Sequence, residues 1–311
     1  MPPVSRFCFL FLLLLAASCR QAPRLIIGQQ RALSWIPSGS GMTADGAQLL
    51  FVGDDGTGIY VTDSTFGSRE KLPIPGIDPA AAREERFAKH DLEASVLVPA
   101  PAGRCLLAFG SGSVSPQRDS LLIYPLTGGA PRFRSLRPLY NELQARSGAL
   151  AWNIEGAALA GTELVLLNRA GNQVFRIPLD AFLRYIEGGP LPAVKVARTR
   201  LPEIGGHEAR FSGAAAIDRK RILFSASVEA TEQWNKDGAV LGSFVGVYDL
   251  EAAAITALAP LVDARGQRLL QKIESVEIRG AMSGNSLPLW AIADNDDGTT
   301  TFFELLLKDL R

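Results

Sequence analysis

The sequence contains few cysteines and histidines, and it has no excess of charge of either sign. Its 311 residues include 3 cysteines and 2 histidines, and 32 basic side chains balance 32 acidic ones. So few cysteines exclude a fold held together by a disulfide framework. The balanced charge leaves no broad basic surface for a phosphate backbone, so nucleic acid is not an expected partner.

Apolar residues, glycine and proline are well represented. Hydrophobic residues make up 47% of the chain and charged residues 21%, with 30 Gly and 19 Pro. This composition is typical of a globular core interrupted by many turns, and it excludes a disordered, collagenous or coiled-coil chain. The length fits two average domains or one large all-β domain.

One long apolar run stands at the N-terminus. Arg6 is the only charge before the run Phe7–Ala17. A helix of that length rises about 16 Å, short of the roughly 30 Å core of a bilayer. We therefore expect residues 1–18 to be a signal peptide rather than a membrane-spanning helix.

The end of this segment, Ala16-Ala17-Ser18-Cys19, resembles a bacterial lipobox. The resemblance implies a lipid on Cys19 and a mature chain that starts there, anchored in a membrane of the bacterial cell envelope. Arg20 follows the cysteine, and the rule for such lipoproteins then points to the periplasmic side of the outer membrane. An ordinary secretory signal cut near Ala17 is the alternative.

A short phrase, Ser or Glu followed by a small residue, recurs along the rest of the chain. It starts at Ser40, Glu93, Glu155, Ser212 and Glu274, with spacings of 53, 62, 57 and 62 residues. After a turn, each phrase is followed by a short hydrophobic run that ends in polar residues, a pattern typical of strands. The period suits about four strands and their connections.

The two ends of the chain together supply one more period. Residues 274–311 are too few for a complete unit, and residues 20–39 make up the difference. This predicts a closed ring in which a strand within Leu25–Trp35 completes the last blade beside Phe302–Leu307. We predict an all-β fold, a five-bladed β-propeller over residues 35–311, preceded by a lipid-anchored segment over residues 19–34 that includes the closing strand. Six blades and a two-domain sandwich are the alternatives.

Helices play a small part in this prediction. The convincing helical segment is Asp180–Tyr185, and Ala80–Ala88 is a weaker candidate. The single cysteine of the predicted domain beyond the anchor, Cys105, lies in an apolar run and is expected to be a buried thiol.

The repeat places polar residues at one end of the ring. If each phrase begins an innermost strand, the start of that strand and the end of its antiparallel partner share one face. Polar side chains that converge on a rigid scaffold are the usual place for binding. The expected ligand-binding residues are Asp54, Glu93, Ser111, Ser113, Glu155, Asn168, Arg169, Glu274 and Asp294.

Three glutamates within one channel would repel each other. Ca²⁺ held by Glu93, Glu155 and Glu274 could neutralise them, and so could Arg169. A structural alternative is that these glutamates accept backbone N–H groups from the next blade and lock the ring. For Asp54 the structural alternative is a residue of a solvated turn.

Other catalytic signatures are missing. The sequence contains no Gly-x-Ser-x-Gly elbow, no His-Glu-x-x-His, no Cys-x-x-Cys and no Walker loop. The segment 294–298 resembles a calcium loop but lacks its first ligand. His90 and His207 are the only candidates for a proton relay near neutral pH.

Several phrases carry a resemblance to a known family. The phrases are the lipobox, His90-Asp91-Leu92-Glu93-Ala94, Phe109-Gly110-Ser111-Gly112-Ser113, Asn153-Ile154-Glu155-Gly156-Ala157 and Leu167-Asn168-Arg169. Together they resemble an uncharacterised bacterial family of exported lipoprotein β-propellers, itself similar to the phytase-like (esterase-like) propeller proteins. That resemblance implies calcium at the mouth and hydrolysis of a phosphate ester, with Glu93, Glu155 and Arg169 at matching positions. Ser40 and Ser212 depart from the acidic pattern in two repeats.

Two functions are consistent with the sequence. The first is a lipid-anchored propeller whose polar mouth binds a small ligand, an ion or a protein partner. The alternative is a calcium-dependent, phytase-like hydrolase of phosphate or carboxylic esters. In that case the three glutamates hold the ion and Arg169 has a catalytic role, steadying developing negative charge.

Overall fold

The computed structural model describes residues 21–101, 103–231 and 238–310. The signal peptide expected over residues 1–18 and the lipidation expected at Cys19 lie outside the described residues, and both stay predictions. Neither described helix is long and apolar enough to cross a membrane.

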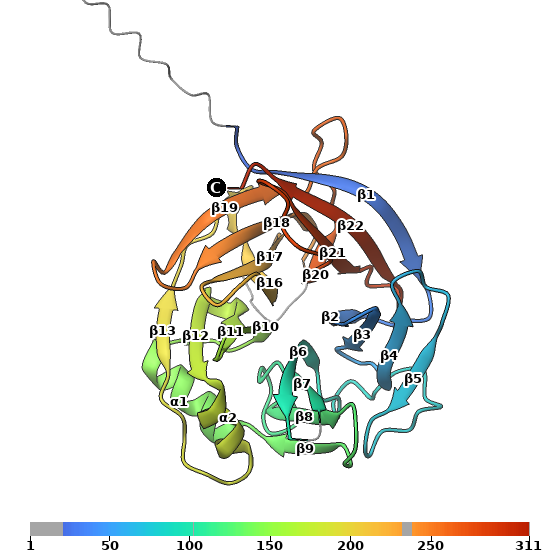
Figure 1. Ribbon diagram of the computed structural model, residues 1–311, viewed down its shortest axis with the longest axis vertical. Coiled ribbons are helices and arrows are strands. Elements are labelled where there is room, and N and C mark those ends of the chain that lie inside the picture. The colour runs from blue at the N-terminus through green and yellow to red at the C-terminus, as the bar shows by residue number, and fades with distance from the viewer. Residues whose placement is uncertain (1–20, 102, 232–237, 311) are drawn as a thin grey trace, which may run out of the picture.

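Five four-stranded antiparallel sheets stand around a central axis as the blades of a propeller (Figure 1). The first blade consists of β2 (Gly39–Asp45), β3 (Gln48–Gly53), β4 (Gly58–Asp63) and β5 (Glu70–Pro73). The second consists of β6 (Leu92–Ala100), β7 (Gly103–Gly110), β8 (Ser120–Pro125) and β9 (Arg132–Ser135). The third consists of β10 (Ile154–Ala160), β11 (Glu163–Asn168), β12 (Gln173–Pro178) and β13 (Lys195–Arg198). The fourth consists of β16 (Arg210–Ala216), β17 (Arg221–Glu229), β18 (Val240–Asp249) and β19 (Ala254–Pro260).

The fifth blade closes the ring with both ends of the chain. It contains β20 (Lys272–Ile278), β21 (Leu287–Asp294), β22 (Thr300–Lys308) and, on its outer edge, β1 (Arg24–Leu33). β1 runs antiparallel to β22 along almost its whole length, from Leu25 opposite Leu307 to Leu33 opposite Thr300. The predicted closing strand and the predicted five blades are therefore confirmed.

Each repeated phrase proves to be a β-bulge. In all five blades the pairing of the two innermost strands skips one residue, and the skipped residues are Ser40, Glu93, Glu155, Ser212 and Glu274. A bulge leaves its extra residue out of the ladder and re-aims that side chain. The fold thus places the same position of every repeat at the start of an innermost strand.

The small residue after each bulge residue is required by close packing. A Cβ added at Gly213 would lie 2.7 Å from the carbonyl oxygen of Glu274 in the next blade and equally close to Ser225 Oγ. At Gly41 it would lie 2.7 Å from a methyl group of Val52. Close packing at the bulge therefore explains why a small residue follows the bulge residue.

Apolar side chains between neighbouring blades form the core. Between the second and third blades, for example, Phe109, Trp152 and Phe175 are buried in one cluster. Cys105 belongs to that cluster as a buried free thiol, as expected.

The helices lie in connections outside the blades. α2 (Leu179–Ile186) confirms the segment predicted over Asp180–Tyr185. α1 (Arg137–Ser147) was not predicted; it begins with Pro138 in its first turn and ends at Gly148, whose φ is 64°. A short 3-10 turn, η1 (Arg169–Gly171), and a hairpin of β14 (Glu203–Ile204) and β15 (His207–Glu208) complete the fold.

The prediction of a helix over Ala80–Ala88 is wrong. This segment consists of turns, because tertiary contacts take up its polar groups. Glu84 N donates to Asp55 O at 2.8 Å, and the carbonyl of Ala81 accepts from Thr57 Oγ1 at 2.9 Å. An isolated helix of that length is marginal in water, so such contacts outweigh it.

Candidate functional site

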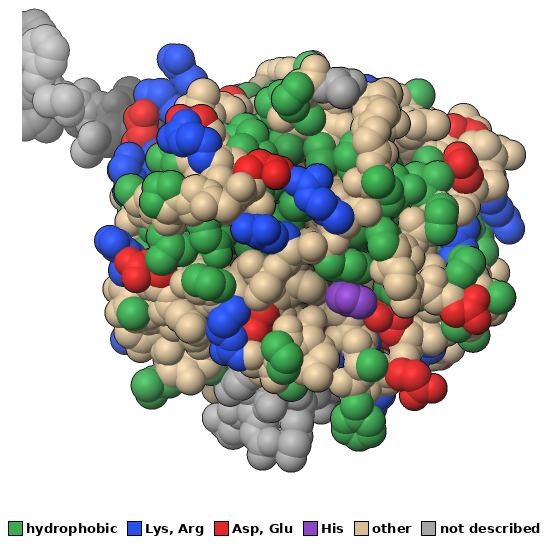
Figure 2. Space-filling model, turned by 90° about the horizontal axis from the view of Figure 1, so that it is seen from below, with side chains coloured by type: hydrophobic (Ala, Val, Ile, Leu, Met, Phe, Trp, Pro, Cys, Tyr) green, Lys and Arg blue, Asp and Glu red, His purple; other side chains and the backbone are tan. Residues whose placement is uncertain are grey.

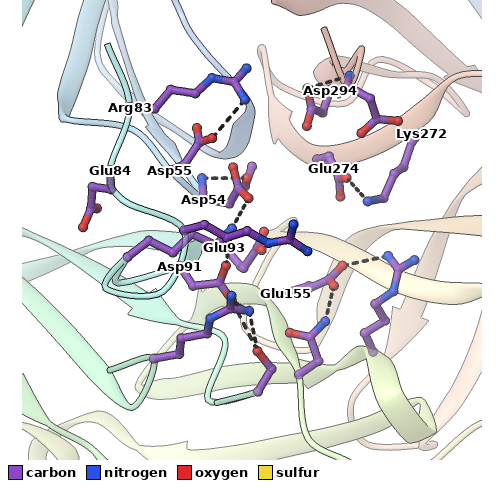
Figure 3. Close-up of a pocket in the computed structure, with 18 of the residues that line it drawn as sticks. Asp54, Asp55, Arg83, Glu84, Asp91, Glu93, Glu155, Lys272, Glu274 and Asp294 are labelled. Atoms are coloured by element: carbon purple, nitrogen blue, oxygen red, sulfur yellow. Dashed lines mark hydrogen bonds and ion pairs between the residues drawn. The ribbon is translucent and has the colours of Figure 1, made fainter. Parts of the chain in front are cut away.

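A pocket of about 580 Å³ opens on the axis, at the end of the ring where the innermost strands begin. All five blades contribute to its wall. Its acidic lining residues are Asp54, Asp55, Glu84, Asp91, Glu93, Glu155, Glu229, Glu274, Asp294 and Asp296. Its basic lining residues are Arg83, Arg86, Lys89, Arg118, Arg169 and Lys272. Figure 3 shows these groups facing one shared space from opposite sides of the ring.

Most residues expected to bind a ligand lie in this wall. They are Asp54, Glu93, Ser113, Glu155, Arg169, Glu274 and Asp294. Two expected residues lie behind it. Ser111 is buried and donates to Asp91 Oδ2, and Asn168 Oδ1 accepts from the backbone N–H of Asn153 at 2.8 Å.

Arg169 is the centre of a buried ion-pair network. It follows β11 directly, and its side chain is 6% exposed. Its Nη1 lies 2.9 Å from Glu155 Oε2, and its Nη2 pairs with Glu229. Burial raises the pKa of Glu155 to about 7, although the guanidinium of Arg169 opposes that rise. Burial disfavours the charged guanidinium too, but Glu155 and Glu274 raise the pKa of Arg169 overall.

Lys272 neutralises the third glutamate of the repeat. Its Nζ lies 3.0 Å from Glu274 Oε1 and 3.9 Å from Glu229 Oε1. Glu155 and Glu274 therefore each have a basic partner within the pocket wall. In the described part of the chain, neither they nor Glu93 accept a backbone N–H from the next blade, so the ring-locking role is not observed for these glutamates.

A different glutamate connects neighbouring blades. Glu277, three residues after Glu274 in β20, accepts the backbone N–H of Ala44 in the first blade at 3.2 Å. Burial raises the pKa of Glu277 to about 7. It lines a smaller hollow of about 180 Å³ among alanine and leucine side chains of the innermost strands.

Lys89 lies between two acids on the other side of the pocket. Its Nζ lies 2.7 Å from Asp91 Oδ1 and also contacts the carboxylate of Asp54. Asp91 Oδ2 accepts in addition from Arg118 Nη1 at 2.9 Å. Burial would lower the pKa of Lys89, but the charges of Asp91 and Asp54 raise it overall.

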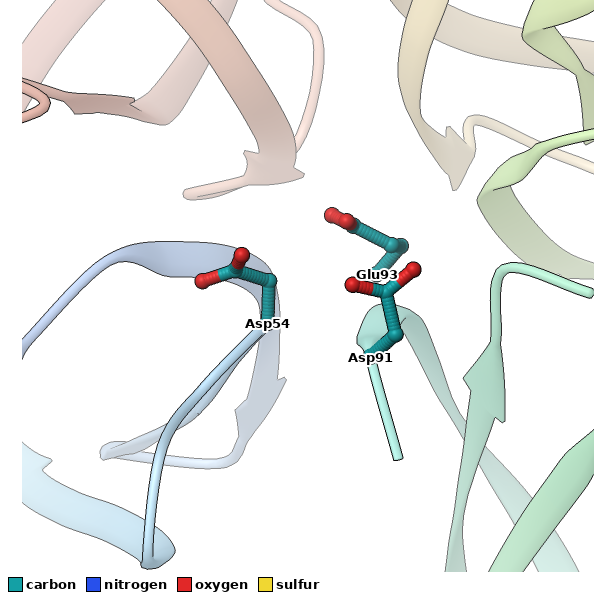
Figure 4. A group of neighbouring side chains, drawn as sticks. All are labelled: Asp54, Asp91 and Glu93. Atoms are coloured by element: carbon teal, nitrogen blue, oxygen red, sulfur yellow. The ribbon is translucent and has the colours of Figure 1, made fainter. Parts of the chain in front are cut away.

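Asp54, Asp91 and Glu93 form a candidate metal site. Each offers a carboxylate oxygen, and these oxygens lie within 4.8 Å of one another (Figure 4). Clustered carboxylates suit Ca²⁺, which takes six to eight oxygen ligands. The residues present thus fit a calcium ion only if the ammonium group of Lys89 moves away.

This group differs from the ligand set expected from the sequence, Glu93, Glu155 and Glu274, which stays a prediction. Of the expected glutamates, only Glu93 belongs to it, because Glu155 is paired with Arg169 and Glu274 with Lys272. Asp91 was not among the expected ligands. It stands two residues before the bulge residue, where the other blades carry Ser38, Asn153, Arg210 and Lys272, and that column of polar residues was the available signal.

Two acids in the pocket make no direct ion pair with a described residue, although one of them, Glu93, lies close enough to Lys89 and Arg169 to raise the pKa of both. Glu93 makes neither an ion pair nor a hydrogen bond there, and burial together with Asp91 and Asp54 raises its pKa well above its usual range. Asp294 accepts only the backbone N–H of Asp296, at 3.1 Å. Burial and then Glu274 raise the pKa of Asp294 to about 7. The pocket therefore carries uncompensated negative charge.

The charged segment between β5 and β6 supplies further lining residues that the sequence analysis did not name. Arg83 pairs with Asp55 at 3.1 Å, and Arg86 lines the pocket beside it. Neither histidine lines the pocket. His90 Nδ1 instead lies 2.9 Å from Glu84 Oε2, and its ring stacks on Phe133.

The outer surface contrasts with this concentrated charge. On the side of the ring seen in Figure 2, basic and acidic side chains alternate with apolar ones, and neither sign forms a broad patch. In the axial pocket, by contrast, ten acidic and six basic side chains face one space.

Solved structures similar to this chain share its fold. Glutaminyl cyclase from Myxococcus xanthus is 9% identical, over 92% of this chain and 97% of that chain, with a TM-score of 0.51. A glycosyl hydrolase from Bacteroides ovatus is 10% identical, over 86% and 84%, with a TM-score of 0.48. The aldose sugar dehydrogenase from Streptomyces coelicolor is 13% identical, over 92% and 98%, with a TM-score of 0.43. At such identities the likeness concerns the fold alone.

No curated protein matches the sequence significantly. The phytase-like and lipoprotein features expected from the sequence therefore stay predictions. A family model does match, over residues 35–307, which is nearly the whole propeller. The chain belongs to this family, a family of unknown function designated DUF6929.

Proposed function

We propose that the protein is an exported, lipid-anchored β-propeller that binds a small, positively charged ligand in its axial pocket. The observation that carries the proposal is the excess of acidic over basic side chains around the pocket, ten against six, with Glu93 and Asp294 making no direct ion pair among the described residues. A cation placed between these two partly buried carboxyl groups would lower the free energy of their ionised forms.

The size and lining of the pocket support this assignment. About 580 Å³ lies within the range of small-molecule sites. The bases Arg169, Lys272 and Lys89 are each held by carboxylates, so they are poorly placed to bind an anion. Arg86 has no acidic partner among the described residues, but acidic lining residues outnumber basic ones by ten to six, so the balance of charge favours a cation such as an amine.

The proposed location rests on the N-terminal sequence. The short apolar run after Arg6 and the lipobox-like end at Cys19 support export and lipid anchoring at the bacterial outer membrane. Residues 20–23 separate that cysteine from β1 in the sequence, so the propeller would stand close to the membrane surface.

Calorimetric titration with n-butylamine tests the proposed binding. We expect saturable binding by the wild-type protein at pH 8 and a loss of at least about tenfold in affinity in Glu93→Gln, because a buried partner charge is removed. Glu85→Gln is the matched control, because Glu85 has the same charge and is exposed outside the pocket wall. Equal affinities in the two variants would contradict the proposal.

The cluster of Asp54, Asp91 and Glu93 supports a second candidate function, calcium-dependent hydrolysis of phosphate or carboxylic esters. These three carboxylates would hold the ion, and bound Ca²⁺ would activate water. Arg169 would offer positive charge to the developing oxyanion, although Glu155 and Glu229 already hold its guanidinium.

A calcium titration tests this second candidate. Lys89→Met removes the ammonium group that lies between Asp54 and Asp91, so the variant should gain Ca²⁺ affinity and a Ca²⁺-dependent rise in melting temperature. Wild-type protein should hydrolyse a panel of phosphate and carboxylic esters with Ca²⁺ and not with chelator. If neither protein shifts its melting temperature with Ca²⁺, the candidate is eliminated.

A further inference from the structure

The most exposed large hydrophobic side chains of the described chain are few. Leu150 is 103% exposed and Phe87 is 91% exposed, and Leu270 and Val114 are each more than half exposed. A bulky apolar side chain in water gives up the free energy that burial would supply. Clustering of such residues marks an interaction surface, whereas single scattered ones need no explanation.

Each of the four is close in the sequence to a residue that lines the axial pocket. Phe87 directly follows Arg86, and Val114 directly follows Ser113. Leu150 stands three residues before Asn153, and Leu270 two residues before Lys272. Each of these apolar residues therefore belongs to a chain segment that also contributes to the pocket wall.

These segments come from different parts of the ring. They are the connection between β5 and β6, the loop between β7 and β8, the approach to β10 and the approach to β20. We call Phe87, Val114, Leu150 and Leu270 the apolar rim. A small amine deep in the pocket would leave the rim untouched, whereas an extended ligand would cover it.

We infer that the natural ligand is a polypeptide segment in which a basic side chain is flanked by apolar residues. This inference rests on the proposed cation-binding function. The basic side chain enters the pocket toward Glu93 and Asp294, and the flanking apolar side chains bury themselves against the rim. Charge complementarity with a pocket wall of ten acidic and six basic side chains fixes the sign of the inserted group, and the exposed rim fixes the character of its neighbours.

Two short peptides separate the contribution of the rim from that of the pocket. Acetyl-Phe-Lys-Phe-amide and acetyl-Ser-Lys-Ser-amide carry the same charge and differ only in their flanks. We expect the wild-type protein to bind the phenylalanine peptide at least about tenfold more tightly, since burial of even one such side chain accounts for that ratio.

Variants of the rim provide the decisive comparison. Phe87→Ser combined with Leu150→Ser should reduce the preference to about twofold or less and leave n-butylamine affinity unchanged. Met282→Ser is the matched control, because Met282 is an exposed apolar residue in the β20–β21 connection, at the opposite end of the blade from Lys272. It should keep the full preference.

The outcomes distinguish the two levels of the proposal. Equal wild-type affinity for the two peptides, or a preference that survives in the double variant, overturns the inference; if n-butylamine still binds, the proposed function stands. A wild-type protein that binds neither n-butylamine nor either peptide overturns the proposed function and the inference with it.

Discussion

Single side chains in the pocket differ sharply in how their charge is compensated. Glu155 and Glu274 come from equivalent bulges, and each has a basic partner, whereas Glu93 makes no direct ion pair with a described residue. The repeated phrase could place these acids on one face. The sequence analysis also named Arg169 as a counter-charge, and Arg169 pairs with Glu155. It did not name Lys272, the partner of Glu274.

Asp294 gives this imbalance a measurable consequence for stability. Its pKa is about 7 in the folded protein, above its ordinary value of 3.8, so the free energy of unfolding should fall as pH rises from 4 to 7. Asp294→Asn keeps the side-chain oxygen that accepts from Asp296 and removes the charge. The variant should gain stability over wild type across this interval, reaching about 1–2 kcal/mol once partial exposure to solvent is allowed for.

Urea unfolding at pH 4, 5.5, 7 and 8 measures this gain. It should grow up to pH 7 and then level off. Glu85→Gln is the control, because Glu85 is an exposed acid outside the pocket wall. A gain for Asp294→Asn that is the same at every pH would contradict a raised pKa.

At the scale of elements, the β-bulge explains both positions of the repeated phrase, the Ser or Glu that is skipped in the pairing and the small residue that follows it. The sequence pattern predicted an innermost strand, but the skipped pairing could be identified only from the ladder itself. α1 escaped the sequence analysis although Pro138, Gly148 and the buried Leu139, Tyr140 and Leu143 are ordinary helix signals. Conversely, the segment over Ala80–Ala88 has helical composition, but contacts with the first blade decide its conformation.

The small residue after the bulge can be tested directly. In Gly213→Ala the new methyl group would lie 2.7 Å from Glu274 O, so the next blade must shift and stability should fall by about 1–3 kcal/mol. Gly280→Ala is the control, because its Cβ would approach nothing nearer than Pro288 at 3.7 Å. Chemical denaturation of both variants gives the comparison, and equal stabilities would argue against close packing as the reason for the glycine.

At the scale of the whole molecule, ring closure could be predicted from the lengths of the repeats. The N-terminal residues complete the period that the C-terminal ones leave unfinished, and β1 pairs with β22 accordingly. The pocket follows from this closure, because five equivalent strand starts converge on one axis. Which acids would stay unpaired could not be predicted, since that depends on side chains from non-repeating connections.

The central claim is that uncompensated acids on the axis bind a cation, and titration with n-butylamine at pH 8 and pH 5 tests it most directly. At pH 8 Asp294 is ionised and the amine is charged, so saturable binding is expected. At pH 5 the pKa of about 7 keeps a proton on Asp294, and affinity should fall at least about tenfold, with protons released when the amine binds. Equal binding at the two pH values, or none at pH 8, would contradict the account.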